Sequence, residues 1–188
     1  MKTNTTMIAA ALLVTATFLT LAPPAMAQTP KPPTQPEYAA ASLSKEDDQG
    51  IRKTVMGVEE SWNNHDMKAF STLLREDAEW INVVGMHWRG RDAVVKAHAI
   101  FHEIMFKNCK LKTDSIEARA LGSDHAIAVV TTTQDAFTTP DGHAMPKGQT
   151  RLSLVLAKSS DGWKIVHAEN VRVDAEAAKN DPVNGRPK

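Results

Sequence analysis

A histidine and a carboxylate near the C-terminal end of the chain have the spacing of one strand face. His167 and Glu169 lie two positions apart in a β-rich run that begins at Trp163. Alternate side chains of a strand point to the same side, so this face would also carry Trp163 and Ile165. A histidine beside a carboxylate can act as an oriented acid–base pair on a bound molecule. The alternative is a polar pair that satisfies its own hydrogen bonds.

A second histidine lies near the middle of an apolar helical face, whose members recur every three or four residues: Val94, His98, Phe101 and Met105. A histidine that faces a cavity can be a general base or acid, because its ordinary pKa lies near neutral pH. The alternative is a core histidine held by one hydrogen bond. We predict three catalytic residues, which are His98, His167 and Glu169.

His98 and His102 also stand one helical turn apart, which is a spacing of paired metal ligands. A metal ion would need a third ligand, from His87, His167 or Glu169. No glutamate directly follows His98, so the metalloprotease motif is absent. No dinucleotide fingerprint, cysteine pair or haem motif is present either. We therefore expect chemistry without a metal ion or a cofactor.

Other residues are candidates for holding a substrate. Trp80 and Asn82 alternate on one predicted strand, where they would provide an aromatic wall and an orienting amide. Arg151 on another strand would hold a substrate carboxylate or neutralise Glu169, with a structural salt bridge as the alternative. The predicted substrate-binding set is Trp62, Trp80, Asn82, Phe101, Arg151 and Asn170.

The elements that must position these residues are predicted in the order helix, helix, strand, helix and then a run of long antiparallel strands. Ser44 and Asp47 form a capping box before a helix with one apolar face, and Asp66 can cap a short second helix. Residues 90–106 hold the third helix. The period-two pattern and the turn residues predict the strands 78–84, 111–121, 125–138, 149–159 and 163–173.

This order predicts an α+β fold, in which about three N-terminal helices cover the concave face of a curved antiparallel sheet. Such a fold can enclose a cone-shaped cavity. Because Trp163 and Ile165 are large and apolar, we expect their face to point inward, together with His167 and Glu169. The opposite face would then expose apolar side chains and predict a homodimer through the sheet, carried by Leu152, Leu154, Leu156 and Val166.

The two ends of the chain differ in composition from this domain. Residues 1–27 combine one lysine, an apolar run and small residues at 25 and 27, as is typical of a cleaved export signal, with an uncleaved anchor as the alternative. We predict a disordered Pro-rich linker over 28–43, one domain over 44–174 and a flexible tail over 175–188. The protein would be periplasmic or secreted.

The charge balance indicates which classes of partner are not expected, and the cysteine content indicates how the domain is stabilised. The chain has 22 basic and 22 acidic residues, so it carries no electrostatic footprint for nucleic acid or for an anionic membrane. We expect neither partner once the export signal is removed. Cys109 is the only cysteine, so the domain must depend on its hydrophobic core in place of an internal disulfide.

Four segments together resemble a known family: Trp62, Glu76-Asp77-Ala78, Gly90-Arg91-Asp92-Ala93-Val94 and Asp161-Gly162-Trp163-Lys164-Ile165-Val166. The chain resembles the nuclear-transport-factor-2-like superfamily and its SnoaL-like group of polyketide cyclases and steroid isomerases. Within this group it is most similar to the SgcJ/EcaC family, over about residues 45–173. That family commonly shows His-Asn where this chain has Glu169 and Asn170. Its oxidoreductase label has no support among the motifs of this sequence.

Two functions follow from the residues and the resemblance. One is a cofactor-free acid–base catalyst of isomerase, cyclase or hydrolase type, acting on a small hydrophobic organic molecule in a central pocket. The other is a binding module that holds such a molecule, or pairs with a second copy, without chemistry. Convergence of the polar side chains on one point would favour the first.

Overall fold

The first helix begins where the sequence supplies its own cap. The computed structural model describes residues 42–183, and helix α1 spans Lys45–Asn64. The Ser44 hydroxyl accepts a hydrogen bond from the Asp47 backbone N–H, which confirms Ser44 as the helix cap, and it donates one to the Asp47 carboxylate, which thus bonds the hydroxyl in place of the Ser44 backbone N–H of a capping box. The helix ends at His65, whose backbone is in the left-handed conformation at φ 55°.

The remaining elements follow the predicted order. The side chain of Asp66 accepts a hydrogen bond from the Ala69 N–H and so caps the second helix, as predicted. The elements after α1 are α2 (Met67–Thr72), β1 (Leu74–Ile81), β2 (His87–Arg89), α3 (Arg91–Ile104), β3 (Leu111–Ala120), β4 (His125–Gln134), β5 (Phe137–Thr138), β6 (Ala144–Met145), β7 (Gly148–Ser159), β8 (Gly162–Arg172) and α4 (Ala175–Ala178).

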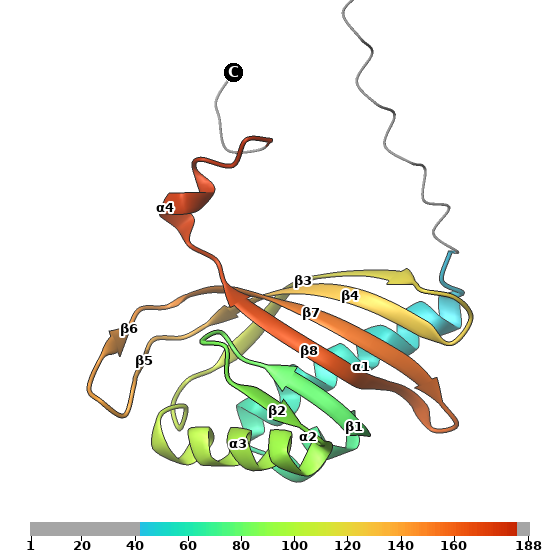
Figure 1. Ribbon diagram of the computed structural model, residues 1–188, viewed down its shortest axis with the longest axis horizontal. Coiled ribbons are helices and arrows are strands. Elements are labelled where there is room, and N and C mark those ends of the chain that lie inside the picture. The colour runs from blue at the N-terminus through green and yellow to red at the C-terminus, as the bar shows by residue number, and fades with distance from the viewer. Residues whose placement is uncertain (1–41, 184–188) are drawn as a thin grey trace, which may run out of the picture. The chain divides into compact units, whose positions relative to one another are not determined.

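Six strands form one curved sheet in the order β2-β1-β8-β7-β4-β3 (Figure 1). Neighbouring strands are antiparallel except β1 and β8, which run parallel. The prediction of an antiparallel sheet is therefore wrong for this one pair, because it assumed that all the strands are too closely connected for parallel crossovers. This assumption does not hold for β1 and β8, since a helix and three long strands lie between them in the chain and allow a long crossover. Strands β5 and β6 form a separate two-stranded ribbon in the connection between β4 and β7.

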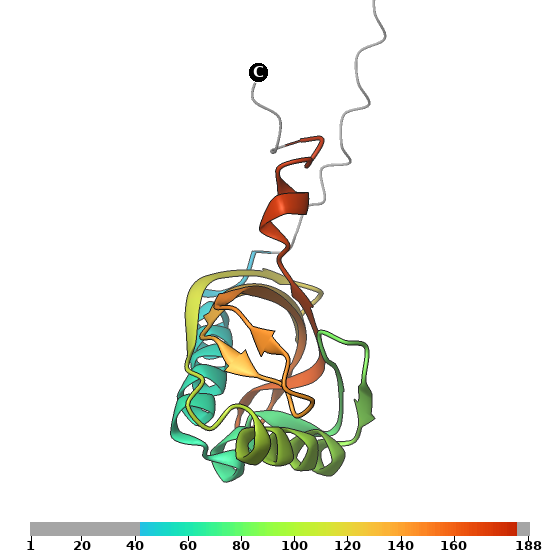
Figure 2. The same ribbon diagram turned by 90° about the vertical axis from the view of Figure 1, so that its left-hand side faces the viewer.

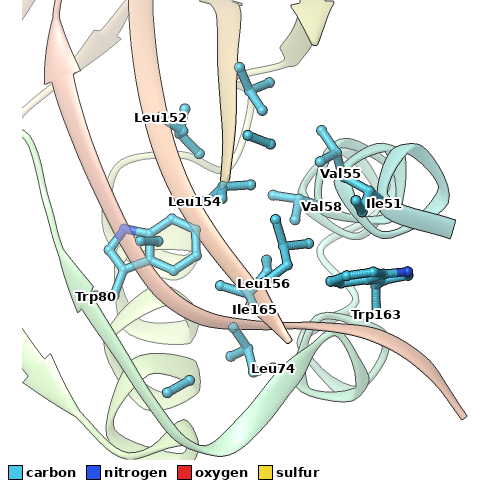
Figure 3. Close-up of a cluster of buried hydrophobic side chains, with 14 of the residues drawn as sticks. Ile51, Val55, Val58, Leu74, Trp80, Leu152, Leu154, Leu156, Trp163 and Ile165 are labelled. Atoms are coloured by element: carbon cyan, nitrogen blue, oxygen red, sulfur yellow. The ribbon is translucent and has the colours of Figure 1, made fainter. Parts of the chain in front are cut away.

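The sheet is strongly curved, and the helices α1, α2 and α3 lie on the side toward which it curls (Figure 2). This arrangement confirms the predicted α+β fold with N-terminal helices on a curved sheet. The apolar stripe of α1 includes Ile51, Val55 and Val58, and it packs against side chains of β7 and β8 (Figure 3). Burial of this shared face is the main favourable contribution to folding.

The leucines of β7 belong to this core. Leu152, Leu154 and Leu156 are 6%, 1% and 0% exposed, and all three belong to the hydrophobic core (Figure 3). The prediction that they form an exposed apolar surface on the outside of the sheet is therefore wrong. The physical reason is that the helices cover the face with the larger apolar area, and on β7 that is the leucine face.

A β-bulge in β8 decides which of its side chains point inward. Leu156 pairs with Ile165, whereas Val155 pairs with His167, so Val166 is an extra residue opposite the straight strand β7. An extra residue of this kind shifts the alternation of side chains by one position. Consequently, odd-numbered residues of β8 point to the core before the bulge, and even-numbered residues point inward after it.

Because of the bulge, the inner face of β8 differs from the predicted one beyond Ile165. Trp163 is buried as expected, but beyond the bulge the buried positions continue with Ala168, while Glu169 is exposed. His167 is half-buried on the same side as Glu169. The prediction that His167 and Glu169 share the inner face with Trp163 and Ile165 is wrong because the period of two is interrupted between them.

Several predictions fall partly or wholly on other parts of the chain. The export signal over 1–27, all but the last two residues of the linker over 28–43, and residues 184–188 of the tail lie outside the described residues. Within the tail, the Asp174 side chain caps the short helix α4. None of the described helices has the length and apolar character that a membrane-spanning helix needs.

Candidate functional site

A cavity of about 420 Å³ lies inside the curved sheet. Its wall combines residues from α1, α2 and α3 with inward-facing residues of the sheet and of the β5–β6 hairpin. The hairpin segment contributes Phe137, Thr139, Pro140 and Met145 to this wall. The wall is dominated by aromatic rings, namely Trp62, Phe70, Trp80, Trp88, Phe101, Phe106 and Phe137. Rings of this kind bind flat apolar molecules by burial and by stacking.

Six of the nine predicted site residues line this cavity: His98, Trp62, Trp80, Asn82, Phe101 and Asn170. The other three, His167, Glu169 and Arg151, lie on the outer face of the sheet. Arg151 is exposed because it alternates with Thr150 and Leu152, whose side chains line the cavity. The structure thus separates His98 from the histidine and carboxylate that were predicted to work with it.

His98 lies within the aromatic wall of the cavity. It is 9% exposed, and its ring centroid lies 4.8 Å from that of Phe70, 4.9 Å from Trp80 and 5.6 Å from Trp88. Its Nδ1 is 2.8 Å from the carbonyl oxygen of Val94, one helical turn earlier. A carbonyl only accepts hydrogen bonds, so the neutral ring carries its proton on Nδ1 and leaves Nε2 as a bare acceptor.

The surroundings of His98 keep it neutral. Burial lowers its pKa from 6.5 to about 4, and the hydrogen bond to Val94 opposes this shift only in part. Among the described residues, Nε2 has no hydrogen-bond partner, and the ring contributes to the cavity wall. At neutral pH the cavity therefore holds one uncharged nitrogen base with a fixed tautomer.

Two asparagines that line the cavity form different hydrogen bonds. Asn170 accepts a hydrogen bond from Trp80 Nε1 at 3.2 Å through its Oδ1 atom, which orients the indole and leaves the amide N–H groups of Asn170 for a ligand. Asn82 instead organises a turn, because its Oδ1 atom accepts hydrogen bonds from the backbone N–H groups of Val84 and Met86. Both amides line the cavity, as predicted.

His102 is buried beside the cavity wall. It is 5% exposed, and its Nδ1 lies 2.8 Å from Nδ1 of His65. Its ring packs against the edge of Trp62 at 4.4 Å. Burial and, to a lesser degree, the neighbouring histidines lower its pKa to about 4, and its buried Nε2 has no partner within residues 42–183. His98 and His102 thus direct their Nδ1 atoms to different partners.

The geometry does not assemble a metal centre from the described residues. Nowhere in residues 42–183 do three His, Cys, Asp or Glu side chains come together as a ligand set. Two of the proposed third ligands, His167 and Glu169, lie on the outer face of the sheet. The other, His87, is 3.0 Å from the carboxylate of Glu79, with which it can form an ion pair when protonated.

Sequence reasoning missed two residues of the cavity wall that matter most for its chemistry. Trp88 packs against His98 at 5.6 Å and belongs to the short strand β2, which is not among the strands predicted from the sequence. Arg172 lies at the end of β8 and is the only Arg, Lys, Asp or Glu among the described cavity-lining residues. Its inward position depends on the bulge at Val166, which no turn residue or proline signals in the sequence.

Comparisons with known proteins agree with this fold. The family model for a SnoaL-like domain matches residues 51–170. A crystal structure of an uncharacterized protein with a cystatin-like fold from Caulobacter vibrioides is 41% identical, with a TM-score of 0.71, and the match covers 73% of this chain and 97% of that chain. No curated protein matches the chain.

Two more distant structures share the fold. A ketosteroid isomerase-like protein from Erwinia carotovora atroseptica is 14% identical with a TM-score of 0.58, over 70% of this chain and 99% of that chain. An NTF2-like protein with a cystatin-like fold from Novosphingobium aromaticivorans is 20% identical with a TM-score of 0.57, over 74% of this chain and 90% of that chain. Together with the family match over most of the folded region, these findings show that the chain belongs to the SnoaL-like domain family, with an NTF2-like, cystatin-like fold.

Proposed function

We propose that the cavity binds a small hydrophobic organic molecule and that His98 Nε2 accepts a hydrogen bond or a proton from it. The observation that carries this proposal is a neutral histidine with its tautomer set by Val94, enclosed by the rings of Phe70, Trp80 and Trp88. A largely apolar cavity with a few converging polar groups is the usual form of a small-molecule site.

The chemistry that fits is proton transfer without a cofactor. His98 Nε2 would take a proton from a carbon next to a carbonyl group, while the amide N–H groups of Asn170 stabilise the negative charge that develops on the carbonyl oxygen. Return of the proton to another carbon would complete an isomerisation. Because the pKa of His98 is lowered to about 4, it is a weak base and requires a substrate with an acidic C–H bond.

A second function has an observation in its favour. No Asp or Glu side chain is among the described residues that line the cavity, so nothing of that kind stabilises the cation that His98 becomes after it takes a proton. This favours a binding module, in which His98 only accepts a hydrogen bond from a hydroxyl or N–H group of the ligand.

One experiment separates the two functions. The probe is 2-tetralone, a bicyclic ketone with acidic hydrogens next to its carbonyl, incubated with the protein in D₂O. Binding is measured by isothermal titration calorimetry, and exchange of hydrogen for deuterium is followed by NMR. Catalysis predicts exchange above the buffer rate that His98→Phe abolishes. His125→Gln is the matched control, because His125 pairs with Asp124 outside the cavity.

The outcomes are distinct. Binding with exchange that depends on His98 supports the catalytic form of the proposal. Binding without exchange supports the binding module. If neither calorimetry nor NMR detects binding of 2-tetralone, the proposed function is refuted.

Three narrower statements stay predictions. Membership of the SgcJ/EcaC family within the SnoaL-like domain family rests on the sequence resemblance alone. Export to the periplasm or beyond the cell rests on the signal-like composition of residues 1–27. The mass of the protein recovered from the cell envelope or the medium tests it, since cleavage after Ala27 leaves a chain that begins with Gln28.

The homodimer through the sheet also stays a prediction, although its original argument is lost because the leucines of β7 are buried. Val129 and Val171 are 36% and 52% exposed on the outer face of the sheet and are the apolar groups that such an interface would cover. Light scattering at micromolar concentration decides between one and two copies.

A further inference from the structure

The charge of the cavity wall is carried by one residue at the end of β8. The described wall contains no Asp, Glu or Lys, and Arg172 is its only residue that is charged at every working pH. Beyond the bulge in β8, Asn170 and Arg172 fall on the same inward face, and Arg172 stands opposite Thr150 of β7. Arg172 is itself exposed, so a cavity that is otherwise neutral has a single guanidinium at its solvent-exposed margin.

The guanidinium is held in place by the base of the β5–β6 hairpin. Its Nη2 donates a hydrogen bond to the Pro146 carbonyl oxygen at 3.0 Å. Gly148 leaves the space that the guanidinium occupies, because a Cβ atom at this position would lie only 3.2 Å from Nη2. One bond to a carbonyl uses one of five N–H donors, and within the described residues no carboxylate forms an ion pair with Arg172.

Two acidic side chains that bond to residues beside the hairpin are already engaged. Asp135, next to the cavity residue Gln134, is 2.9 Å from Lys147 Nζ, and this contact lowers the pKa of Asp135. Asp114 accepts hydrogen bonds from Thr133 and Gln149. These carboxylates have partners of their own, so the charge of Arg172 is available to a ligand.

The structure assigns the ligand to a chemical class. We propose that the cavity binds an organic anion with a flat apolar body and one acidic group, which Arg172 holds at the end of β8. This inference rests on the proposed function and specifies its ligand. The apolar body contacts the aromatic wall near Trp80 and His98, while Asn170 and Arg172 lie two residues apart on β8, with their Cα atoms about 7 Å apart. An arginine with free donors binds a carboxylate through paired, charge-assisted hydrogen bonds.

The test compares two probes that differ in charge alone. The probes are 2-naphthoate and 2-naphthamide, which have the same aromatic body, and the binding constants are measured by isothermal titration calorimetry on the purified protein. We expect 2-naphthoate to bind about tenfold more tightly than 2-naphthamide, in line with the strength of charge-assisted hydrogen bonds. We expect Arg172→Gln to abolish this preference without weakening the binding of 2-naphthamide.

Two further variants separate charge from structure. Arg172→Lys keeps the charge and should retain part of the preference for the anion. Arg119→Gln removes an exposed arginine of β3 and should leave both affinities unchanged. If Arg172→Gln weakens both probes equally, the arginine acts by holding the hairpin, and the proposal is overturned.

Different binding results would overturn the anion proposal and the proposed function. Equal affinities of the wild-type protein for the two probes would overturn the anion proposal and leave the apolar pocket intact. An absence of binding for both probes, together with no binding of 2-tetralone, would refute the proposed function itself.

Discussion

Acidification should weaken the folded state through His98. The folded protein holds this histidine neutral, since burial lowers its pKa from 6.5 to about 4. The unfolded chain therefore binds more protons than the folded protein between these two values. The free energy of unfolding falls as the pH falls through this range and rises again with pH.

The size of this effect follows from the two pKa values. The contribution of His98 is almost complete at pH 7, and linkage gives a loss of about 2 kcal/mol on going to pH 5 and about 3 kcal/mol on going to pH 4. His98→Phe keeps an aromatic ring between Phe70, Trp80 and Trp88 and removes the titrating nitrogen. The hydrogen bond to Val94 is lost at every pH and cancels when the two pH values are compared.

The assay is chemical unfolding by urea at pH 7 and at pH 5, followed by circular dichroism, for the wild-type protein and for His98→Phe. His102 and the carboxylates titrate in both proteins, so the difference between them isolates His98. The wild-type protein should lose about 2 kcal/mol more than the variant between pH 7 and pH 5. Equal losses would show that His98 is solvated or charged in the folded protein, and the reasoning behind the proposed base would be refuted.

Three further predictions test the fold and the core. Ser44→Ala should lower the free energy of unfolding by about 1 kcal/mol in urea titrations, because the Asp47 N–H at the start of α1 loses its capping partner. Leu154→Ala should cost about 3 kcal/mol in the same assay, since the side chain is 1% exposed and its loss opens a cavity in the core; a cost below 1 kcal/mol would contradict this packing. Cys109 should resist a thiol-specific disulfide reagent at pH 8 until the protein is unfolded, because burial raises its pKa to about 11.

The features that could be predicted from the sequence depend on neighbours along the chain. The caps at Ser44 and Asp66 are formed by residues three positions apart. The position of His98 on the inner face of α3 follows from the helical period, which no distant contact can change once the helix forms. The same reasoning placed Trp62 and Phe101, and they line the cavity.

The features that could not be predicted depend on contacts between distant segments. The alternation of β8 holds only within each half of the strand, because pairing with β7 inserts a bulge at Val166. That one residue moves His167 and Glu169 to the outer face and brings Asn170 and Arg172 to the cavity.

The sequence by itself thus determined the helices, their caps and the histidine that faces inward, since these are consequences of local hydrogen bonding and of a period set within one segment. Only the tertiary structure decided which groups surround that histidine. Strand register and bulges are chosen by the packing of the whole sheet against the helices, and a shift of one residue exchanges one face of a strand for the other.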